Sequence, residues 1–130
     1  MRVGRLLEET GYDTEQLRAL LDPIDPGHLR LRAAAPLLRR IWGRGTGAMT
    51  LGKLILVDPA ILNGDRERLA RLTLHELIHV RQWSELGWPG FLRRYLADYL
   101  NGRRLGLSHH DSYLEIGLEV EARTSSSELI

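Results

Sequence analysis

Residues 73–83, with the sequence Thr-Leu-His-Glu-Leu-Ile-His-Val-Arg-Gln-Trp, constrain the fold of this 130-residue chain more than any other stretch. Apolar residues occur on several sides of a helix drawn through this segment, which predicts a central helix largely covered by other elements. The segment contains His-Glu-x-x-His. Residues four apart share one helix face, so His75 and His79 point the same way and can hold one metal ion between their imidazoles.

Glu76 follows His75 directly and therefore lies at the edge of the same helix face. From there it can reach a water on the metal without being a ligand itself, which is how zinc peptidases place their general base. The alternative is a partly buried helix with two hydrogen-bonded histidines and a surface glutamate. The apolar setting favours a metal site, because a carboxylate and two imidazoles are costly there unless they are paired or bind something.

Composition limits the kind of metal site and the kind of partner. The chain has no cysteine, so a metal must be held by His, Asp or Glu. Its net charge of +1 creates no global field that would attract nucleic acid or a membrane. An arginine-rich nucleic-acid-binding protein remains an alternative class, but this charge and the lack of a base-stacking motif argue against it.

The length and the apolar content of 43% are typical of one globular domain with a real core. No apolar run approaches a membrane span, and Glu8 and Glu9 interrupt the start of any signal peptide. We therefore predict a cytoplasmic protein without a membrane partner. The sequence does not indicate its oligomeric state.

The first 45 residues are expected to form an N-terminal helical extension to a core of residues 46–123. Asp13 or Thr14 can cap a short helix that ends at Leu21. Pro36 can begin another helix, from Leu37 to Trp42.

Residues 48–57 are the only convincing strand material, and Gly52 can fold them into a short β-ribbon. With so few strands, one edge is expected to be exposed. Such an edge can pair with an extended peptide substrate, or the ribbon can simply be a structural hairpin.

The central helix is expected to run from an N-cap at Asp65 to Leu86, with Gly87 after its end. A second helix follows and ends near Gly102. Its large side chains recur at helical spacing, which predicts one core stripe: Phe91, Leu92, Tyr95, Leu96, Tyr99 and Leu100.

The C-terminal segment offers three carboxylates, Glu115, Glu119 and Glu121. Glu121 lies about 200° around a helix from Glu119, so the two cannot face one ion together. Glu115 shares a face with Glu119 if the helix is continuous, but Gly117 can break it there. The polar tail, residues 124–128, is expected to fray.

These motifs resemble a known family. His75-Glu76-Leu77-Ile78-His79, followed about forty residues later by Glu119-Val120-Glu121-Ala122, is similar to the gluzincin clan of zinc metallopeptidases. The match is closer to small bacterial zincin-like domains, and it covers about residues 47–123. It rests on the strand at Met49–Gly52, on Gln82 after the second histidine, on Phe91-Leu92 with Tyr95-Leu96, and on Tyr113 before Glu119 and Glu121.

The resemblance implies a minimal zincin-like fold of the α+β class, predominantly helical, with a central helix and a short β-ribbon. It implies a Zn²⁺ ion bound by His75, His79 and Glu119. By the helix geometry above, Glu115 is the runner-up ligand and Glu121 the partner of an arginine. The resemblance also implies hydrolysis of peptide or protein substrates.

In the mechanism that this family would use, Glu76 is the general base. A further donor for the oxyanion is usual, and Tyr113 is our candidate, with Arg123 or His110 in reserve. The alternative function is a zinc-binding interaction module that catalyses no reaction.

Overall fold

The computed structural model describes residues 1–37 and 47–129. Helices dominate this part of the chain, and a small sheet of three strands accompanies them, so the predicted α+β, predominantly helical fold class is confirmed. Within these two ranges, no helix is both long enough and apolar enough to cross a membrane.

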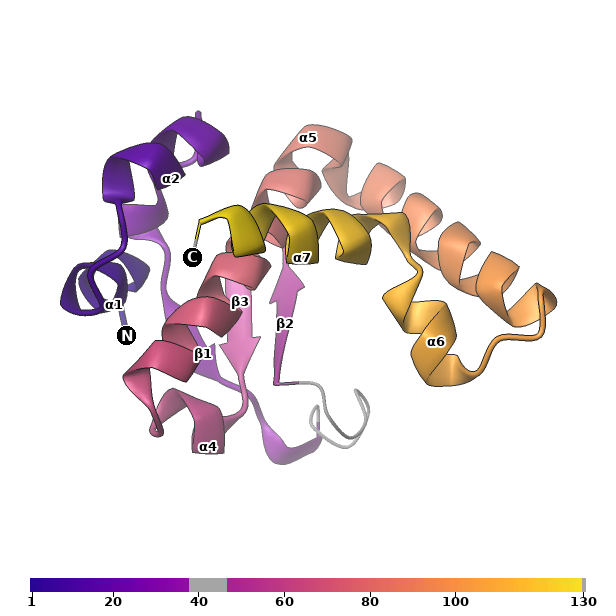
Figure 1. Ribbon diagram of the computed structural model, residues 1–130, viewed down its shortest axis with the longest axis horizontal. Helices are drawn as coiled ribbons and strands as arrows, with labels where there is room; N and C mark the ends of the chain where they lie inside the picture. The colour runs from indigo at the N-terminus through magenta and orange to yellow at the C-terminus, as the bar shows by residue number, and fades with distance from the viewer. Residues whose placement is uncertain (38–46, 130) are drawn as a thin grey trace.

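The sheet has the strand order β1-β3-β2 (Figure 1). Strands β2 (Ala48–Leu51) and β3 (Leu54–Val57) form the expected antiparallel ribbon. Gly52 turns between them with a φ of 64°, a conformation that favours glycine. Strand β1 (Leu31–Ala33) pairs parallel to β3 and was not expected, although apolar and polar side chains alternate over residues 29–33, Leu-Arg-Leu-Arg-Ala, as they do in a strand.

Residues 1–37 also form helices α1 (Val3–Glu9) and α2 (Thr14–Leu21) and the 3₁₀ turn η1 (Pro26–His28). The side chain of Asp13 caps α2 by accepting hydrogen bonds from the backbone N–H groups of Glu15 and Gln16. The helix expected from Leu37 to Trp42 lies, apart from its first residue, outside the described residues.

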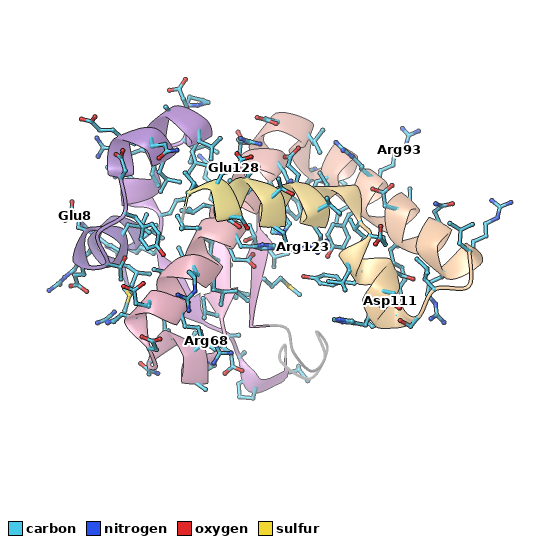
Figure 2. All side chains as sticks on the ribbon, in the orientation of Figure 1. Glu8, Arg68, Arg93, Asp111, Arg123 and Glu128 are labelled. Atoms are coloured by element: carbon cyan, nitrogen blue, oxygen red, sulfur yellow. The ribbon has the colours of Figure 1, made fainter. Side chains whose placement is uncertain are left out.

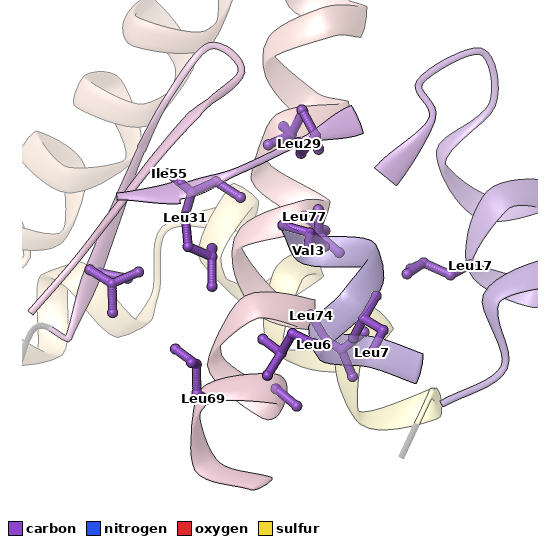
Figure 3. Close-up of a cluster of buried hydrophobic side chains, with 14 of the residues drawn as sticks. Val3, Leu6, Leu7, Leu17, Leu29, Leu31, Ile55, Leu69, Leu74 and Leu77 are labelled. Carbon is purple, nitrogen blue, oxygen red and sulfur yellow. The ribbon is translucent and has the colours of Figure 1, made fainter. Parts of the chain in front are cut away.

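The main core joins these N-terminal elements to the sheet and the central helix (Figure 3). It consists of buried aliphatic side chains from all three parts, among them Val3, Leu6, Leu7, Leu17, Leu21, Leu31, Ile55, Val57, Leu69, Leu74 and Leu77. The N-terminal segment is therefore packed into the same core as the central helix, and it supplies strand β1 as well as helices.

Helix α4 (Pro59–Leu62) precedes the long helix α5 (Arg66–Arg104), which begins at the N-cap Asp65. Gly87, with φ 70° and ψ 167°, interrupts α5 and divides it into a first part, residues 66–86, and a second part, residues 88–104. The first part is the predicted central helix. The second part corresponds to the next predicted helix and ends two residues beyond Gly102.

Helices α6 (His109–Leu114) and α7 (Gly117–Glu128) complete the chain. Gly117 begins α7, and its backbone N–H donates to the carboxylate of Asp98, which fixes the start of α7 on the second part of α5. The tail does not fray as expected. Helix α7 continues through it, because Ser126 is buried and Ser126 and Ser127 both bond back to the carbonyl of Arg123.

The predicted core stripe on the second part of α5 is wrong for its leucines. Phe91 is buried in a second core cluster with Ile116 and Leu118, and Tyr95 packs against it. Leu92, Leu96 and Leu100 are exposed instead. The spacing was read correctly as helical, but α6 and α7 cover only one side of this helix, and the aromatic residues occupy that side.

Candidate metal centre

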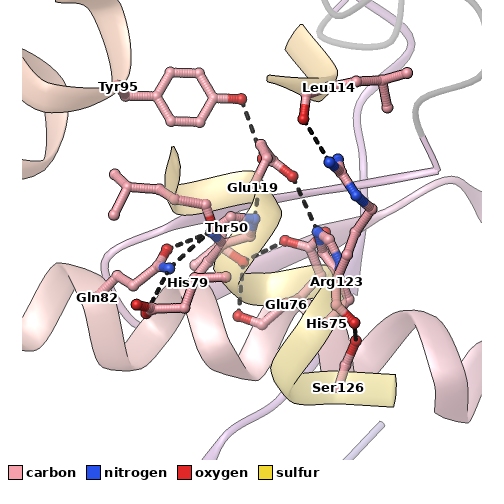
Figure 4. Close-up of polar contacts among 12 residues, drawn as sticks. Thr50, His75, Glu76, His79, Gln82, Tyr95, Leu114, Glu119, Arg123 and Ser126 are labelled. Atoms are coloured by element: carbon pink, nitrogen blue, oxygen red, sulfur yellow. Dashed lines mark hydrogen bonds and ion pairs between the residues drawn. The ribbon is translucent and has the colours of Figure 1, made fainter. Parts of the chain in front are cut away.

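Two helices bring the candidate ligands together. The first part of α5 presents His75 and His79 one turn apart, and α7 presents Glu119 opposite them (Figure 4). Nε2 of His75 lies 3.1 Å from one carboxylate oxygen of Glu119, and Nε2 of His79 lies 3.0 Å from the other. One ligand atom from each residue lies within 4.8 Å of the others, which is close enough for a single ion.

The donor set fits zinc. Two imidazole nitrogens and one carboxylate oxygen are ligand types that Zn²⁺ accepts, and bonds of about 2.0–2.1 Å in a tetrahedron separate neighbouring ligand atoms by about 3.3 Å. The nitrogen-to-oxygen separations of 3.0 and 3.1 Å are near that value. The histidine–glutamate cluster therefore needs only small side-chain movements to hold such an ion.

Electrostatics favour an ionised Glu119. Burial alone would raise the pKa of this carboxyl, but the hydrogen bonds and charges of His75 and His79 outweigh it and hold the pKa well below its ordinary value. Burial would likewise lower the pKa of His79, yet the contact with Glu119 raises it. A negative charge is thus kept in a buried place because two imidazoles face it.

Gln82 orients the ring of His79. Its Nε2 donates to the carbonyl of Leu118 and to the carboxylate of Glu121, both at 3.0 Å, so its Oε1 faces Nδ1 of His79 at 2.8 Å. Since Oε1 only accepts, Nδ1 must carry a proton. Nε2 of His79 lies 3.0 Å from a carboxylate oxygen of Glu119, which only accepts, so Nε2 donates to Glu119 here and is the nitrogen that would bind a metal after losing that proton.

Glu76 lies beside the three candidate ligands and is held by the sheet. The hydroxyl of Thr50, on β2, donates to its carboxylate at 2.6 Å. Glu76 is only 5% exposed, and burial raises its pKa although His79 and Thr50 oppose that shift. A buried carboxylate with a raised pKa is a better proton acceptor than an exposed one.

Two tyrosines face Glu119 from different helices. The hydroxyl of Tyr95, on α5, donates to the Glu119 carboxylate at 3.1 Å. Tyr113, the candidate oxyanion donor on α6, is half-buried. Burial, followed by the charge of Glu119, raises the pKa of both phenols, so both stay protonated and can donate.

The other candidates are placed elsewhere. Arg123 donates to the carbonyl of Leu114, and His110 is exposed on α6. Glu115 is exposed in the turn between α6 and α7, so it does not share a continuous helix with Glu119. Glu121 pairs with Arg81 at 3.2 Å.

Thr50 and Tyr95 were not identified from the sequence. A polar residue on the inward side of a short strand, as Thr50 is, must find a partner once buried. The hydroxyl of a core tyrosine such as Tyr95 also usually finds one. Burial of these hydroxyl groups predicts that each has a hydrogen-bond partner. Only the packing of β2 and α7 on α5 shows which residue that partner is.

Comparison with known proteins finds no match among protein-family models, curated proteins or solved structures.

Proposed function

We propose that this protein is a zinc-dependent metallopeptidase. The observation that carries the proposal is the buried cluster of His75, His79 and Glu119, two nitrogens and one oxygen from two helices within bonding reach of one ion. Three protein ligands leave one position of a tetrahedral site open, which is typical of catalytic zinc. Zinc bound there would lower the pKa of a coordinated water and polarise a substrate carbonyl.

The side chains around the cluster would transfer protons and donate to the oxyanion. Glu76 would accept a proton from the attacking water at its carboxylate and return it to the leaving amine. Thr50 holds that carboxylate in place. Tyr113 is the candidate donor to the oxyanion, because it lies on the Glu119 side of the cluster and keeps its proton.

An extended peptide has a plausible place to bind. Strand β2 lies at one end of the sheet order, and within the described ranges it pairs only with β3. Its other edge can therefore offer backbone hydrogen bonds to a substrate chain. Because β2 also carries Thr50, a peptide on this edge would lie close to Glu76.

The test combines metal content with hydrolysis. Purified protein should carry about one zinc per chain by elemental analysis, and it should cleave members of a fluorogenic peptide library or an unfolded protein such as casein. Glu76→Gln should keep the zinc and lower the cleavage rate by about 10²–10⁴, because Gln cannot accept the proton. Glu115→Gln, which neutralises an exposed carboxylate, is the matched control and should cleave normally.

Two results would refute the proposal. One is the absence of any transition metal after incubation with zinc. The other is cleavage by Glu76→Gln at the wild-type rate.

A zinc-binding module without catalysis is the second candidate. The observation in its favour is that Glu76 is buried and already engaged by Thr50 at 2.6 Å. This candidate predicts one zinc per chain in both the wild type and Glu76→Gln, with no cleavage of any library member by either protein.

A further inference from the structure

Three exposed leucines lie along one face of the second part of α5. Leu92, Leu96 and Leu100 are 48%, 56% and 55% exposed. Their spacing of four residues places them along one helix face, and Trp88, 69% exposed, precedes them at the same spacing. We call these four residues the leucine stripe. Large apolar side chains that are exposed next to one another are typical of a surface that binds a protein, a ligand or a membrane.

The charges near the leucine stripe are mostly positive. Residues 86–110 contain four arginines, Arg93, Arg94, Arg103 and Arg104, against one carboxylate, Asp98, which gives a charge of +3 within a chain of +1. Asp98 accepts from the backbone of Gly117 and so faces α7, and Arg94 also lies against Gly117, which leaves Arg93, Arg103 and Arg104 away from α7. Arg93 points away from the rest of the protein (Figure 2). Nearly all of the local charge is therefore positive.

The stripe lies at one end of the molecule. The second part of α5 and α6 extend away from α1, α2 and the sheet (Figure 1). Residues 88–104 form a helix of about 25 Å at 1.5 Å per residue, so its exposed face can lie flat on a surface.

The charge decides between possible occupants of this face. A second copy of the chain would bring the arginines of one helix against those of the other, which is unfavourable. A surface that is both apolar and anionic complements leucine, tryptophan and arginine together. A helix with Leu and Trp on one side and Arg beside them is typical of segments that lie in the interface of an anionic membrane.

We propose that the second part of α5 binds the surface of an anionic lipid bilayer. The leucines enter the boundary between headgroups and acyl chains, Trp88 lies at the interface, and the arginines contact the lipid phosphates. The net charge of +1 gives no indication of this basic surface, because the rest of the sequence carries a charge of −2 that offsets the +3 of residues 86–110.

Vesicle co-sedimentation tests this proposal with the full chain. Vesicles of phosphatidylglycerol and phosphatidylcholine in equal parts should bind the protein, and vesicles of phosphatidylcholine alone should bind it at least about tenfold less. The triple variant Leu92→Ser, Leu96→Ser, Leu100→Ser should lose binding by at least about tenfold. Since these side chains are exposed, its circular dichroism and thermal unfolding should match those of the wild type.

Arginine variants separate this helix from other basic surfaces. Arg93→Gln and Arg104→Gln should each weaken binding about fivefold, the effect of about 1 kcal/mol per basic residue near an anionic surface. Arg2→Gln and Arg30→Gln are the matched controls. They line an arginine-rich cavity beside α1, away from the second part of α5, and should leave binding unchanged.

Three outcomes would overturn the proposal. The first is no binding to the anionic vesicles. The second is equal binding by the triple leucine variant. The third is a dimer, seen by light scattering, that the leucine substitutions dissolve, which would make the stripe an interface between two copies.

Discussion

At the residue scale, one amide decides which nitrogen of His79 faces the metal position. Gln82 fixes a proton on Nδ1, so Nε2 is the nitrogen that faces Glu119 and the candidate metal position. Gln82→Met should therefore weaken zinc binding by about 10–100-fold, which is the usual effect of removing a residue that hydrogen-bonds to a metal ligand. Competition with a chromophoric chelator measures the affinity. Gln16→Met, at an exposed position of α2, is the control, and an unchanged affinity in Gln82→Met would show that the ring needs no orienting amide.

The two glutamates of α7 should behave differently although they are two residues apart. Glu119 contacts both histidines, whereas Glu121 pairs with Arg81 and Gln82. Loss of a residue that only hydrogen-bonds to a metal ligand weakens metal binding by about 10–100-fold. We expect Glu119→Ala to weaken zinc binding by more than this, and Glu121→Ala to weaken it by no more than this. Equal zinc affinity in the two variants, measured by the same competition assay, would reject Glu119 as the third ligand.

What the sequence predicts at this scale depends on whether a contact is local. His75, Glu76 and His79 lie within one turn, so helix geometry alone relates them. Glu119 lies on another helix, and only the resemblance to gluzincins suggested it. The contacts of Thr50 and Tyr95 join different elements, and no pattern in the sequence specifies such a pairing.

At the element scale, Gly87 allows the chain to turn between the two parts of α5. Its φ of 70° and ψ of 167° lie in a region that is essentially restricted to glycine. Gly87→Ala should lower the free energy of unfolding by about 1–3 kcal/mol, as measured with denaturant.

Gly90→Ala is the matched control for Gly87→Ala. Gly90 is helical, and an added Cβ would meet only the Cβ of Leu86 at 3.4 Å. This substitution should be neutral or should stabilise by up to about 1 kcal/mol, because alanine favours helix. If Gly87→Ala is as stable as Gly90→Ala, the break at Gly87 is not maintained in solution.

A third glycine sets the distance between two helices. A Cβ on Gly102 would lie 3.0 Å from Cα, Cβ and Oγ of Ser112, so α6 packs directly on the backbone of α5. Gly102→Ala should destabilise the protein and shift α6. A lower melting temperature, together with changed amide resonances in α6, would show this. An unchanged melting temperature would mean that α6 can move aside without cost.

The elements that the sequence predicts are those with local signals. Caps at Asp13 and Asp65 and the turn at Gly52 mark boundaries that the structure keeps. Strand β1 has a local signal that was missed, since Leu29, Leu31 and Ala33 alternate with arginines, but its parallel pairing with β3 is not specified by that pattern. Helical spacing also does not say which side of a helix will be covered, so it placed Leu92, Leu96 and Leu100 in the core.

At the scale of the whole molecule, the candidate metal position lies where distant parts of the chain meet. The first part of α5 supplies the histidines, β2 holds Glu76, and α7 supplies Glu119 from the C-terminal end. The first part of α5 and β2 belong to the main core, which the N-terminal helices complete, whereas the start of α7 packs in the second core cluster. The fold class could be predicted from the sequence, but the joining of α7 to α5 depends on tertiary packing.

This arrangement predicts that zinc stabilises the whole fold and not only the site. An ion bound by two helices binds the native state and not the unfolded chain, so free zinc at a hundred times its dissociation constant should add about 2.7 kcal/mol to the free energy of unfolding. The melting temperature should therefore rise with zinc and fall with a chelator. Amide hydrogen exchange in α7 should slow as well, because Glu119 ties that helix to α5.

Glu115→Ala should still be stabilised by zinc, since Glu115 is exposed outside the cluster, whereas Glu119→Ala should not be. If wild-type protein melts at the same temperature in zinc and in chelator, the two helices do not share an ion.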